Sequence, residues 1–381
     1  ILLIFISSFL YAFNDYKSAI RASQLGFKTA VVEKESLGGV CLNWGCIPTK
    51  ALLKSAQVFE YLNHAEDYGL NADNISHDFK KVIERSRNVA SGMSKGVNFL
   101  MKKNKIDILK GFGKIKKNKV VSVDGTDYSA KHIIIATGAK SRVLPSIPQD
   151  GKQIIGYREA MTLEKQPKSI TIVGSGAIGI EFAYFYNSIG SDVTVIEYMP
   201  NIVPLEDVDV SKELEKSFKK KGIKIMTSSE VISVEKKKNK VLVSVKSNGK
   251  EDIIESEILL SAVGIKSNIE NIGLEDVGIA TDRDKILVDK WYNTNIPGYY
   301  AIGDIVAGPA LAHVASAEGI LCVEKVAGHD VSPIDYGNIP GCTYCSPEIS
   351  SVGLTEKQAL EKGYKIKAVS YTHLRAHETN S

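Results

Sequence analysis

The chain has 381 residues, of which 44% are hydrophobic and 24% charged, and its formal net charge is +4. This length exceeds one typical domain, and the composition is that of a soluble globular protein. The small net charge, with no aromatic residues interleaved along a basic stripe, argues against a nucleic-acid-binding protein. Five cysteines, an odd and low number, argue against a secreted disulfide framework. A cytoplasmic protein is therefore expected, with an organelle matrix as the alternative.

The chain begins with an apolar segment, Ile1 to Phe13, that is interrupted only by Ser7 and Ser8. The segment is shorter than the roughly 18 residues that a membrane span requires. No basic region or small-residue cleavage site accompanies it, so a signal peptide also fits poorly. We therefore expect a buried β-strand with an altered start, and no association with a membrane.

Two segments repeat one pattern, in which an apolar strand, a turn and an amphipathic helix precede a strand that ends on glutamate. The earlier copy keeps its helix end, at Gly26, and its second strand, Thr29 to Glu33. The clearer copy begins with the strand Ser169 to Val173 and closes with the strand Asp192 to Glu197. Two βαβ openings predict an α/β fold with two Rossmann-like nucleotide-binding domains.

The second unit carries the better phosphate signal, because Gly174, Gly176 and Gly179 follow an apolar strand and open a helix. The first glycine makes the turn, the second lets the backbone approach a pyrophosphate, and the third permits close helix packing. Glu197 is expected to accept hydrogen bonds from ribose hydroxyls. No arginine follows it, which favours NAD over NADP. The alternative is a tight strand–helix turn without a ligand.

Glu33 has the matching position in the first unit, but the glycines that should precede its helix are missing. The phosphate loop is expected near Leu10 to Asp15, where the sequence is Leu-Tyr-Ala-Phe-Asn-Asp. Bulky side chains at these positions would block the close approach of a pyrophosphate. This segment therefore departs from a working dinucleotide site.

Further elements are predicted from periodicity and turn residues. They are helices over 49–62, 79–102, 209–221 and 311–326, and strands over 133–138, 258–264 and 299–304. The last stretch, Ile339 to Val369, is expected to begin a third domain.

The strongest chemical signal is Gly38-Gly-Val-Cys41-Leu-Asn-Trp-Gly-Cys46-Ile-Pro-Thr-Lys50. Two cysteines five apart at the start of a predicted helix lie within bridging reach if the first turn is distorted. A bridge that closes so small a loop is a poor structural staple. A helix N-terminus lowers the pKa of a thiol and favours the thiolate that exchange chemistry requires. The alternative, two buried packing cysteines, is disfavoured by the surrounding glycines, Trp44 and Lys50.

This segment resembles the redox-disulfide signature of the pyridine nucleotide–disulfide oxidoreductases. Asn43-Trp44 and Ile47 to Lys50 are more similar to the dihydrolipoamide dehydrogenases than to the glutathione or mercuric reductases. The similarity continues from about Ala19 to Ala368. Supporting stretches are Ala136 to Gly138, Gly174 to Glu181, Ala262 to Gly264, Ala301 to Asp304 and Pro309 to His313.

The resemblance implies FAD-dependent oxidation of protein-bound dihydrolipoamide to lipoamide, with NAD as acceptor and a redox-active disulfide between them. It also implies a homodimer whose partner is the lipoyl domain of a 2-oxo acid dehydrogenase complex or of the glycine cleavage system. Two alternatives stay open. A sibling reductase of the glutathione or mercuric type predicts an arginine-rich pocket after Glu197, and a non-catalytic binding fragment is compatible with the missing glycines.

The resemblance also implies individual roles. Cys41 would exchange with the substrate dithiol, and Cys46 would face the flavin ring as a charge-transfer thiolate. Lys50 would lie near the flavin N5 and pair with Glu181, and Asp304 would bind the ribityl chain. The residues expected at FAD are Glu33, Lys34, Gly38, Gly39, Lys50, Gly113, Thr137, Gly138, Asp304, Ala310, Leu311, Ala312 and His313. Those expected at NAD are Gly174, Gly176, Ile178, Gly179, Glu181, Glu197, Val231 and Gly264.

No metal site is expected. Cys342-Thr-Tyr-Cys345 is a bare CxxC without a second pair or a strand–helix redox context, and it is interpreted as ordinary packing. His313 is interpreted as structural or flavin-adjacent.

The expected domains follow from the same resemblance. They are an FAD-binding domain over 1–149 and 266–337, an NAD-binding domain over 150–265, the start of an α+β dimerisation domain over 338–368, and a non-native tail over 369–381. In the family, the general base is a histidine paired with a glutamate in the dimerisation domain, supplied across the dimer. His377-Glu378 has the wrong context for that pair, so this chain is expected to be incomplete as a catalyst.

Overall fold

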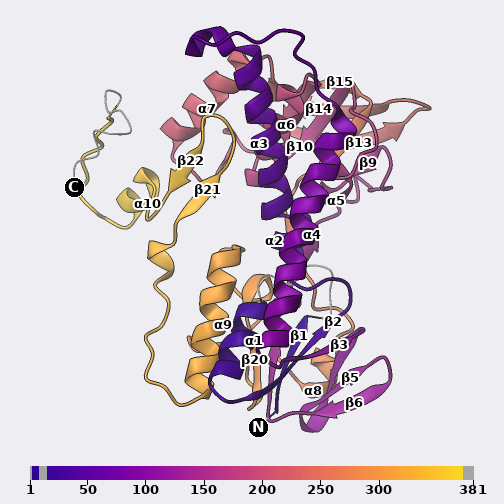
Figure 1. The fold of residues 1–381 in the computed structure, drawn as a ribbon. Helices are drawn as coiled ribbons and strands as arrows, with labels where there is room; N and C mark the ends of the chain where they lie inside the picture. Colours follow the sequence, from indigo (N-terminus) through magenta and orange to yellow (C-terminus); the bar gives the residue numbers. More distant parts are fainter. Residues whose placement is uncertain (1, 8–14, 372–381) are drawn as a thin grey trace.

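The computed structural model describes residues 2–7 and 15–371. Two lobes, each built around a parallel sheet, are connected by the long helix α4 (Phe79–Lys103), which runs from one lobe to the other (Figure 1). Two predictions fall outside the described residues: the phosphate loop near Leu10 to Asp15, apart from Asp15 itself, and the tail after residue 371.

The first lobe contains a five-stranded parallel sheet in the order β20-β7-β1-β2-β3. Its strands are β1 (Leu2–Ser7), β2 (Lys28–Glu33), β3 (Asp107–Lys110), β7 (His132–Ile135) and β20 (Tyr299–Ala301). The predicted N-terminal strand is confirmed for residues 2–7, which form the central strand. Helices α1 (Asp15–Gln24) and α9 (Ala312–Val326) pack closely at Gly319, which has no Cβ. A Cβ at this position would lie 1.7 Å from the Ser18 Oγ.

The second lobe has its own five-stranded parallel sheet in the order β12-β11-β10-β16-β9. Its strands are β9 (Ile154–Ile155), β10 (Ser169–Val173), β11 (Asp192–Ile196), β12 (Lys224–Met226) and β16 (Ile258–Ser261). Helices α6 (Ala177–Ser188) and α7 (Val208–Lys220) belong to this lobe. An antiparallel sheet of β13 (Ser229–Lys236), β14 (Val241–Ser247) and β15 (Lys250–Ser256) accompanies it. The two βαβ openings are confirmed, and with them the α/β fold.

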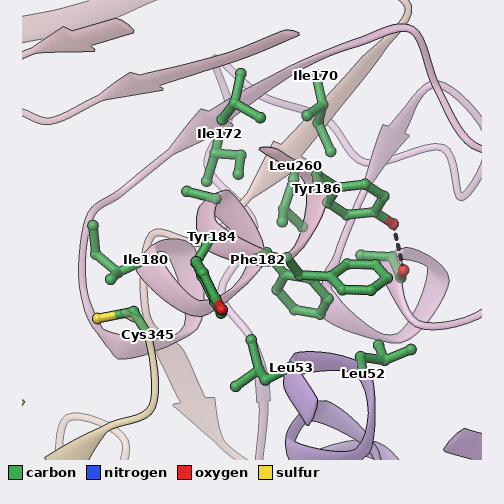
Figure 2. Close-up of a cluster of buried hydrophobic side chains, with 14 of the residues drawn as sticks. Leu52, Leu53, Ile170, Ile172, Ile180, Phe182, Tyr184, Tyr186, Leu260 and Cys345 are labelled. Atoms are coloured by element: carbon green, nitrogen blue, oxygen red, sulfur yellow. Dashed lines mark hydrogen bonds between the residues drawn. The ribbon is translucent and has the colours of Figure 1, made fainter. Parts of the chain in front are cut away.

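The helix α3 (Cys46–Asn63) joins the lobes through its packing on α6 (Figure 2). Leu52 and Leu53 belong to the same buried cluster as Phe182 and Tyr186 of α6. The ring of Tyr186 is fully buried, and its hydroxyl donates to the Ala160 carbonyl at 2.6 Å, which satisfies this buried polar atom. The helix that begins at Cys46 is therefore held by the core of the second lobe.

The remaining elements are short. The helices are α2 (Gly39–Trp44), α5 (Tyr157–Ala160), α8 (Leu274–Val277), α10 (Glu356–Glu361) and single 3₁₀ turns at Ala65–Tyr68, Lys117–Lys119, Gly303–Ile305 and Tyr336–Asn338. The strands are β4 (Gly113–Lys116), β5 (Val120–Val123), β6 (Thr126–Ser129), β8 (Ala139–Ser141), β17 (Ile265–Ser267), β18 (Thr281–Asp282), β19 (Lys285–Ile286), β21 (Gly341–Thr343) and β22 (Ile349–Ser351). In the described parts of the chain, no helix is long and apolar enough to cross a membrane.

Candidate redox centre

The two cysteines of the signature lie on either side of a break between two helices. Cys41 lies within α2, and Cys46 is the first residue of α3. Gly45 makes the break with φ −142° and ψ −120°, and a Cβ there would lie 2.9 Å from the Val40 carbonyl oxygen. Pro48 is tolerated because the first N–H groups of a helix have no partner within it. The predicted distortion of the first turn is thus a break at Gly45.

The two thiols are unlinked and share a hydrogen bond. The bond from Cys41 lowers the pKa of Cys46, and the Lys50 ammonium and the backbone at the helix start lower it further. The same bond, together with burial, raises the pKa of Cys41. The pair is therefore asymmetric, because the pKa of Cys46 is lowered and that of Cys41 is raised.

Lys50 and Glu181 lie at one place but do not form the expected ion pair. Among the residues that the structure describes, no such pair is present; the Lys50 ammonium lies 4.0 Å from the centroid of the Tyr344 ring. Glu181 accepts a hydrogen bond from the Tyr344 backbone N–H at 2.9 Å. The two charges still interact, since burial raises the pKa of Glu181 and Lys50 opposes that rise. Sequence reasoning did not identify Tyr344, which is distant along the chain from both groups.

Four of the residues expected at FAD lie at the end of β2 and the start of α2. Glu33 is buried, and its Oε1 accepts from the Glu35 N–H at 2.7 Å. The Lys34 ammonium lies 5.8 Å from the Phe112 ring centroid. Gly38 and Gly39 have positive φ angles of 99° and 63°, a conformation that glycine adopts without strain. The turn before the cysteines therefore needs glycine for its backbone conformation.

Thr137 and Gly138 follow β7 at its carboxyl end, where α/β sheets bind ligands. The Thr137 Oγ1 donates to the Asn268 carbonyl at 2.6 Å, and the Asn268 N–H donates to the Gly138 carbonyl at 2.8 Å. Gly138 has φ +65°. Gly113, by contrast, begins β4 and pairs with Val123 in a small antiparallel sheet.

Asp304 carries the clearest sign of an external ligand. Its side chain is 2% exposed, and neither carboxylate oxygen has a hydrogen-bond partner. Burial raises the pKa of this carboxyl well above its usual range, and the neighbouring charge of Lys285 opposes that rise. Buried carboxylates normally accept hydrogen bonds, so this one is free to accept them from a bound group or from water. A polyhydroxylated chain such as that of a flavin can donate such bonds.

We expect Asp304→Asn to stabilise the cofactor-free chain at pH 8 by about 1–3 kcal/mol, because burial penalises the charged carboxylate and the amide carries no charge. Because the pKa of Asp304 is raised on folding, the folded state keeps a proton that the unfolded state has released. Stability of the parent chain then falls as pH rises from the unfolded pKa toward the folded one. Urea unfolding at pH 5 and pH 8 measures the difference, and an identical pH dependence in both proteins would contradict it.

The residues Ala310 to His313 lead into α9, near Asp304. Leu311 precedes the helix, Ala312 is its first residue, and both are partly exposed. His313 is exposed, and its Nε2 lies 3.1 Å from the Pro340 carbonyl oxygen. This contact connects the start of α9 to the segment that precedes β21.

The three glycines of the second unit differ in what they permit. Gly174 has φ +97°, and a Cβ there would lie 2.4 Å from the Ala262 carbonyl oxygen. A Cβ on Gly179 would lie 1.9 Å from the Gly174 oxygen, whereas one on Gly176 would meet nothing within 4 Å. Gly174 and Gly179 thus serve the turn and the packing, and Gly176 leaves open space at the start of α6, as a phosphate requires.

Glu197 already has hydrogen-bond donors within the chain. Its Oε2 accepts from the Ser175 N–H at 2.8 Å and the Ser175 hydroxyl at 2.7 Å, and its Oε1 accepts from the Met199 N–H at 2.7 Å. A carboxylate has about four acceptor positions, so one remains for a ribose hydroxyl. These bonds fix the carboxylate beside the glycine turn, which the sequence interpretation did not foresee.

The other residues expected at NAD surround the same turn more loosely. Ile178 lies in the first turn of α6 and is 37% exposed. Val231 lies in β13 at a register shift. Gly264 has φ +102°, and its carbonyl accepts from the Arg142 N–H at 3.0 Å.

The second cysteine pair is not a linked or metal-binding unit. Cys345 is buried in the cluster around Ile180, where burial raises the pKa of its thiol to about 12 (Figure 2). Cys342 lies in β21 and accepts from the Ser350 hydroxyl at 3.4 Å. In the portion of the chain that the structure describes, no group of three or more His, Cys, Asp or Glu side chains could hold a metal ion. The packing role expected for Cys345 is confirmed.

Comparisons with known proteins agree with this geometry. Residues 16–319 match the model of the pyridine nucleotide-disulphide oxidoreductases, and residues 339–380 match their dimerisation domain. Among similar proteins, the dihydrolipoyl dehydrogenase of Rhizobium etli is 50% identical, covering 93% of this chain and 78% of that protein. The dihydrolipoyl dehydrogenase of Bacillus subtilis is 43% identical, covering 93% and 78%.

Solved structures are similar over the same extent. LpdA from Mycobacterium tuberculosis superposes with a TM-score of 0.86 at 26% identity, covering 95% of this chain and 80% of that one. The flavoprotein disulfide reductase RclA from Escherichia coli superposes with a TM-score of 0.83 at 25% identity, covering 96% and 80%. The chain therefore belongs to the pyridine nucleotide-disulphide oxidoreductase family.

Proposed function

We propose that this chain oxidises protein-bound dihydrolipoamide to lipoamide with NAD as acceptor, as a dihydrolipoyl dehydrogenase. The asymmetric thiol pair carries the proposal, because it provides one stabilised thiolate and one protonated neighbour at a helix start. The 50% identity to the Rhizobium etli dihydrolipoyl dehydrogenase supports the choice of substrate.

The asymmetry sets the direction of exchange with the substrate. In the oxidised pair, a substrate thiolate attacks the sulfur of Cys41, the Cys41–Cys46 bond breaks, and Cys46 leaves with the electron pair. Thiols of low pKa are the better leaving groups, and the pKa of Cys46 is the lowered one. The second substrate thiol then attacks the substrate sulfur of the mixed disulfide and releases Cys41, which takes up the proton of that thiol. This closes the lipoamide disulfide and leaves both cysteines reduced.

The polar surroundings of the cysteines suit a substrate arm carried on another protein. A pocket of about 380 Å³ lies beside the turn between the two cysteines. Its lining residues are Ser36, Asn43, Trp44, Arg87, Ser91, Ser94, Lys95 and Asn98. We propose that the dithiol of a lipoyl domain, from a 2-oxo acid dehydrogenase complex or the glycine cleavage system, approaches through this pocket.

The two cofactors would be held by the two lobes. We propose that segments 1–149 and 266–337 hold FAD, with Asp304 accepting from the ribityl hydroxyls, and that 150–265 holds NAD at Gly176 and Glu197. FAD supplies two-electron transfer between the Cys46 thiolate and the nicotinamide. Lys50 places a positive charge next to Cys46, and Glu197 disfavours the 2′-phosphate of NADP. Residues 338–368 would begin the dimerisation domain of a cytoplasmic homodimer.

In the chain given a glycine-rich loop at residues 10–15 and a complete dimerisation domain, we expect FAD to be retained and the purified protein therefore to be yellow, and the flavin absorbance to bleach when dihydrolipoamide is added without oxygen. NAD should then restore the absorbance, and NADP at the same concentration should not. Glutathione and dihydrolipoamide are compared at equal thiol concentration. A colourless protein, or bleaching by glutathione alone, would contradict the proposed function.

A further inference from the structure

The turn that carries the cysteines is held by a cluster of charged and aromatic side chains, two of which, Trp44 and Arg87, also line the pocket beside the turn. We call Glu35, Trp44, Arg87 and Arg158 the Trp44 clamp. The guanidinium carbons of Arg87 and Arg158 lie 4.2 and 4.1 Å from the centroid of the Trp44 ring. The Trp44 Nε1 donates to the Glu35 Oε1 at 3.1 Å, and Arg158 forms an ion pair with the same oxygen at 2.5 Å.

Arg87 also binds the turn directly. Its Nη2 donates to the carbonyl oxygen of Asn43, which lies midway between Cys41 and Cys46. The Asn43 side chain in turn donates to the Leu37 and Gly39 carbonyls at 3.0 and 2.9 Å, so this residue is fixed at both ends. Arg87 belongs to α4, and thus connects the redox turn to the longest helix of the chain.

The cluster carries costs that packing alone does not explain. The Arg87 Nη1 and the Glu35 Oε2 are buried without hydrogen-bond partners. Burial, with the charge of Arg158 nearby, lowers the pKa of the Arg87 guanidinium. Unsatisfied buried polar groups are rare in folded proteins, and such local violations concentrate at functional sites. These unsatisfied groups lie next to the turn between Cys41 and Cys46, where a disulfide bond would form and break in each catalytic cycle.

We propose that Arg87 is a positioning residue for the thiol pair: through Asn43 and Trp44 it holds the turn in the geometry that brings the two sulfur atoms together. A disulfide needs its sulfurs about 2.05 Å apart with a narrow range of dihedral angles. A turn that is held in place presents the thiols to each other at a higher effective concentration, which favours the disulfide and makes the pair more reducing. This inference rests on the proposed function only in taking Cys41 and Cys46 as the redox pair.

Removing the Arg87 contacts should therefore make the disulfide easier to reduce. We expect Arg87→Met to lower the effective concentration of the two thiols about tenfold, which corresponds to a rise of about 30 mV in reduction potential. The full chain is equilibrated in graded mixtures of reduced and oxidised dithiothreitol and then alkylated. Mass spectrometry of the peptide that contains both cysteines then gives the fraction of the pair that was reduced in each mixture. This measurement needs neither a substrate nor turnover.

Arg85→Met is the matched control. Arg85 lies on the same helix and makes the same kind of bond, from its Nη1 to the Ala51 carbonyl of α3 at 2.7 Å, but it does not contact the turn. We expect no shift for this variant. Equal shifts in Arg85→Met and Arg87→Met would mean a general loosening of α4 and would overturn the proposal, as would no shift in Arg87→Met.

Arg87→Lys keeps a positive charge and one donor for the Asn43 carbonyl, and it covers the case in which the methionine variant does not fold. We expect it to shift the potential in the same direction by less than tenfold, and an unchanged potential would count against the proposal. If Cys41 and Cys46 of the parent chain formed no disulfide in any mixture, the proposed function itself would be contradicted. The two failures are therefore distinguishable.

Discussion

In the chain given a glycine-rich loop at residues 10–15 and a complete dimerisation domain, Cys46→Ser is expected to reduce the dihydrolipoamide-dependent reduction of NAD to the background rate. The hydroxyl of serine does not ionise near neutral pH and forms no disulfide, so both the acceptor bond and the stabilised thiolate are lost. Electron transfer from NADH through the flavin to an external acceptor does not involve the cysteines. NADH-dependent reduction of a one-electron dye should therefore persist in this variant, and comparison of the two rates gives the measurement.

The matched control for this substitution is Cys342→Ser, in which a partly exposed thiol outside the pair becomes a hydroxyl. It should leave both rates unchanged. The parent chain adds a second readout, since Cys46 should be alkylated by iodoacetamide at lower pH than Cys41. That order follows from the lowered pKa of Cys46 and the raised pKa of Cys41. The opposite order of alkylation would refute the assignment of roles.

Gly179→Ala is expected to have the largest effect on stability among the glycine substitutions in the second lobe. The added methyl group would lie 1.9 Å from the Gly174 carbonyl oxygen, so α6 must move away from β10. That helix carries Phe182 and Tyr186 into the core, and overpacking of this kind costs about 1–3 kcal/mol or more. Urea unfolding measures the loss.

Gly176→Ala distinguishes an effect on stability from an effect on NAD binding. Gly176 has φ −66° and open space around its Cβ position, so the variant should lose less than about 1 kcal/mol of stability. The same methyl group would occupy the surface that a pyrophosphate needs, and NAD should bind more weakly. Equal stability losses in the two variants, or unchanged NAD binding in Gly176→Ala, would show that the glycines do not divide their roles in this way.

Local patterns in the sequence predicted the helices and strands that depend on residues close together along the chain. The helix predicted over 209–221 is Val208–Lys220, and that over 79–102 is Phe79–Lys103. The helix predicted from residue 49 begins three residues earlier, at Cys46, because a proline in a first turn does not prevent helix formation. Hydrophobic periodicity gives the face of an element and its approximate length, and these were the parts predicted well.

Contacts between distant segments could not be predicted in the same way. Tyr344 contacts both Lys50 and Glu181, and nothing in the sequence around it indicates that it lies there. The approach of Arg87 to Trp44 is equally long-range, since a helix position specifies a direction and not the residue it meets. Asp304 was identified through a family motif, and only the structure showed that its oxygens lack partners.

The packing of α3 on α6 has a consequence for how the two lobes share electrons. One end of α3 holds the Cys46 thiolate, and α6 begins at the turn where the nicotinamide dinucleotide would bind. Leu52 and Phe182 lie in one close-packed cluster between these sites, and close-packed cores transmit displacement instead of absorbing it. We therefore expect the spacing between the thiol pair and the dinucleotide turn to be set by this close-packed interior.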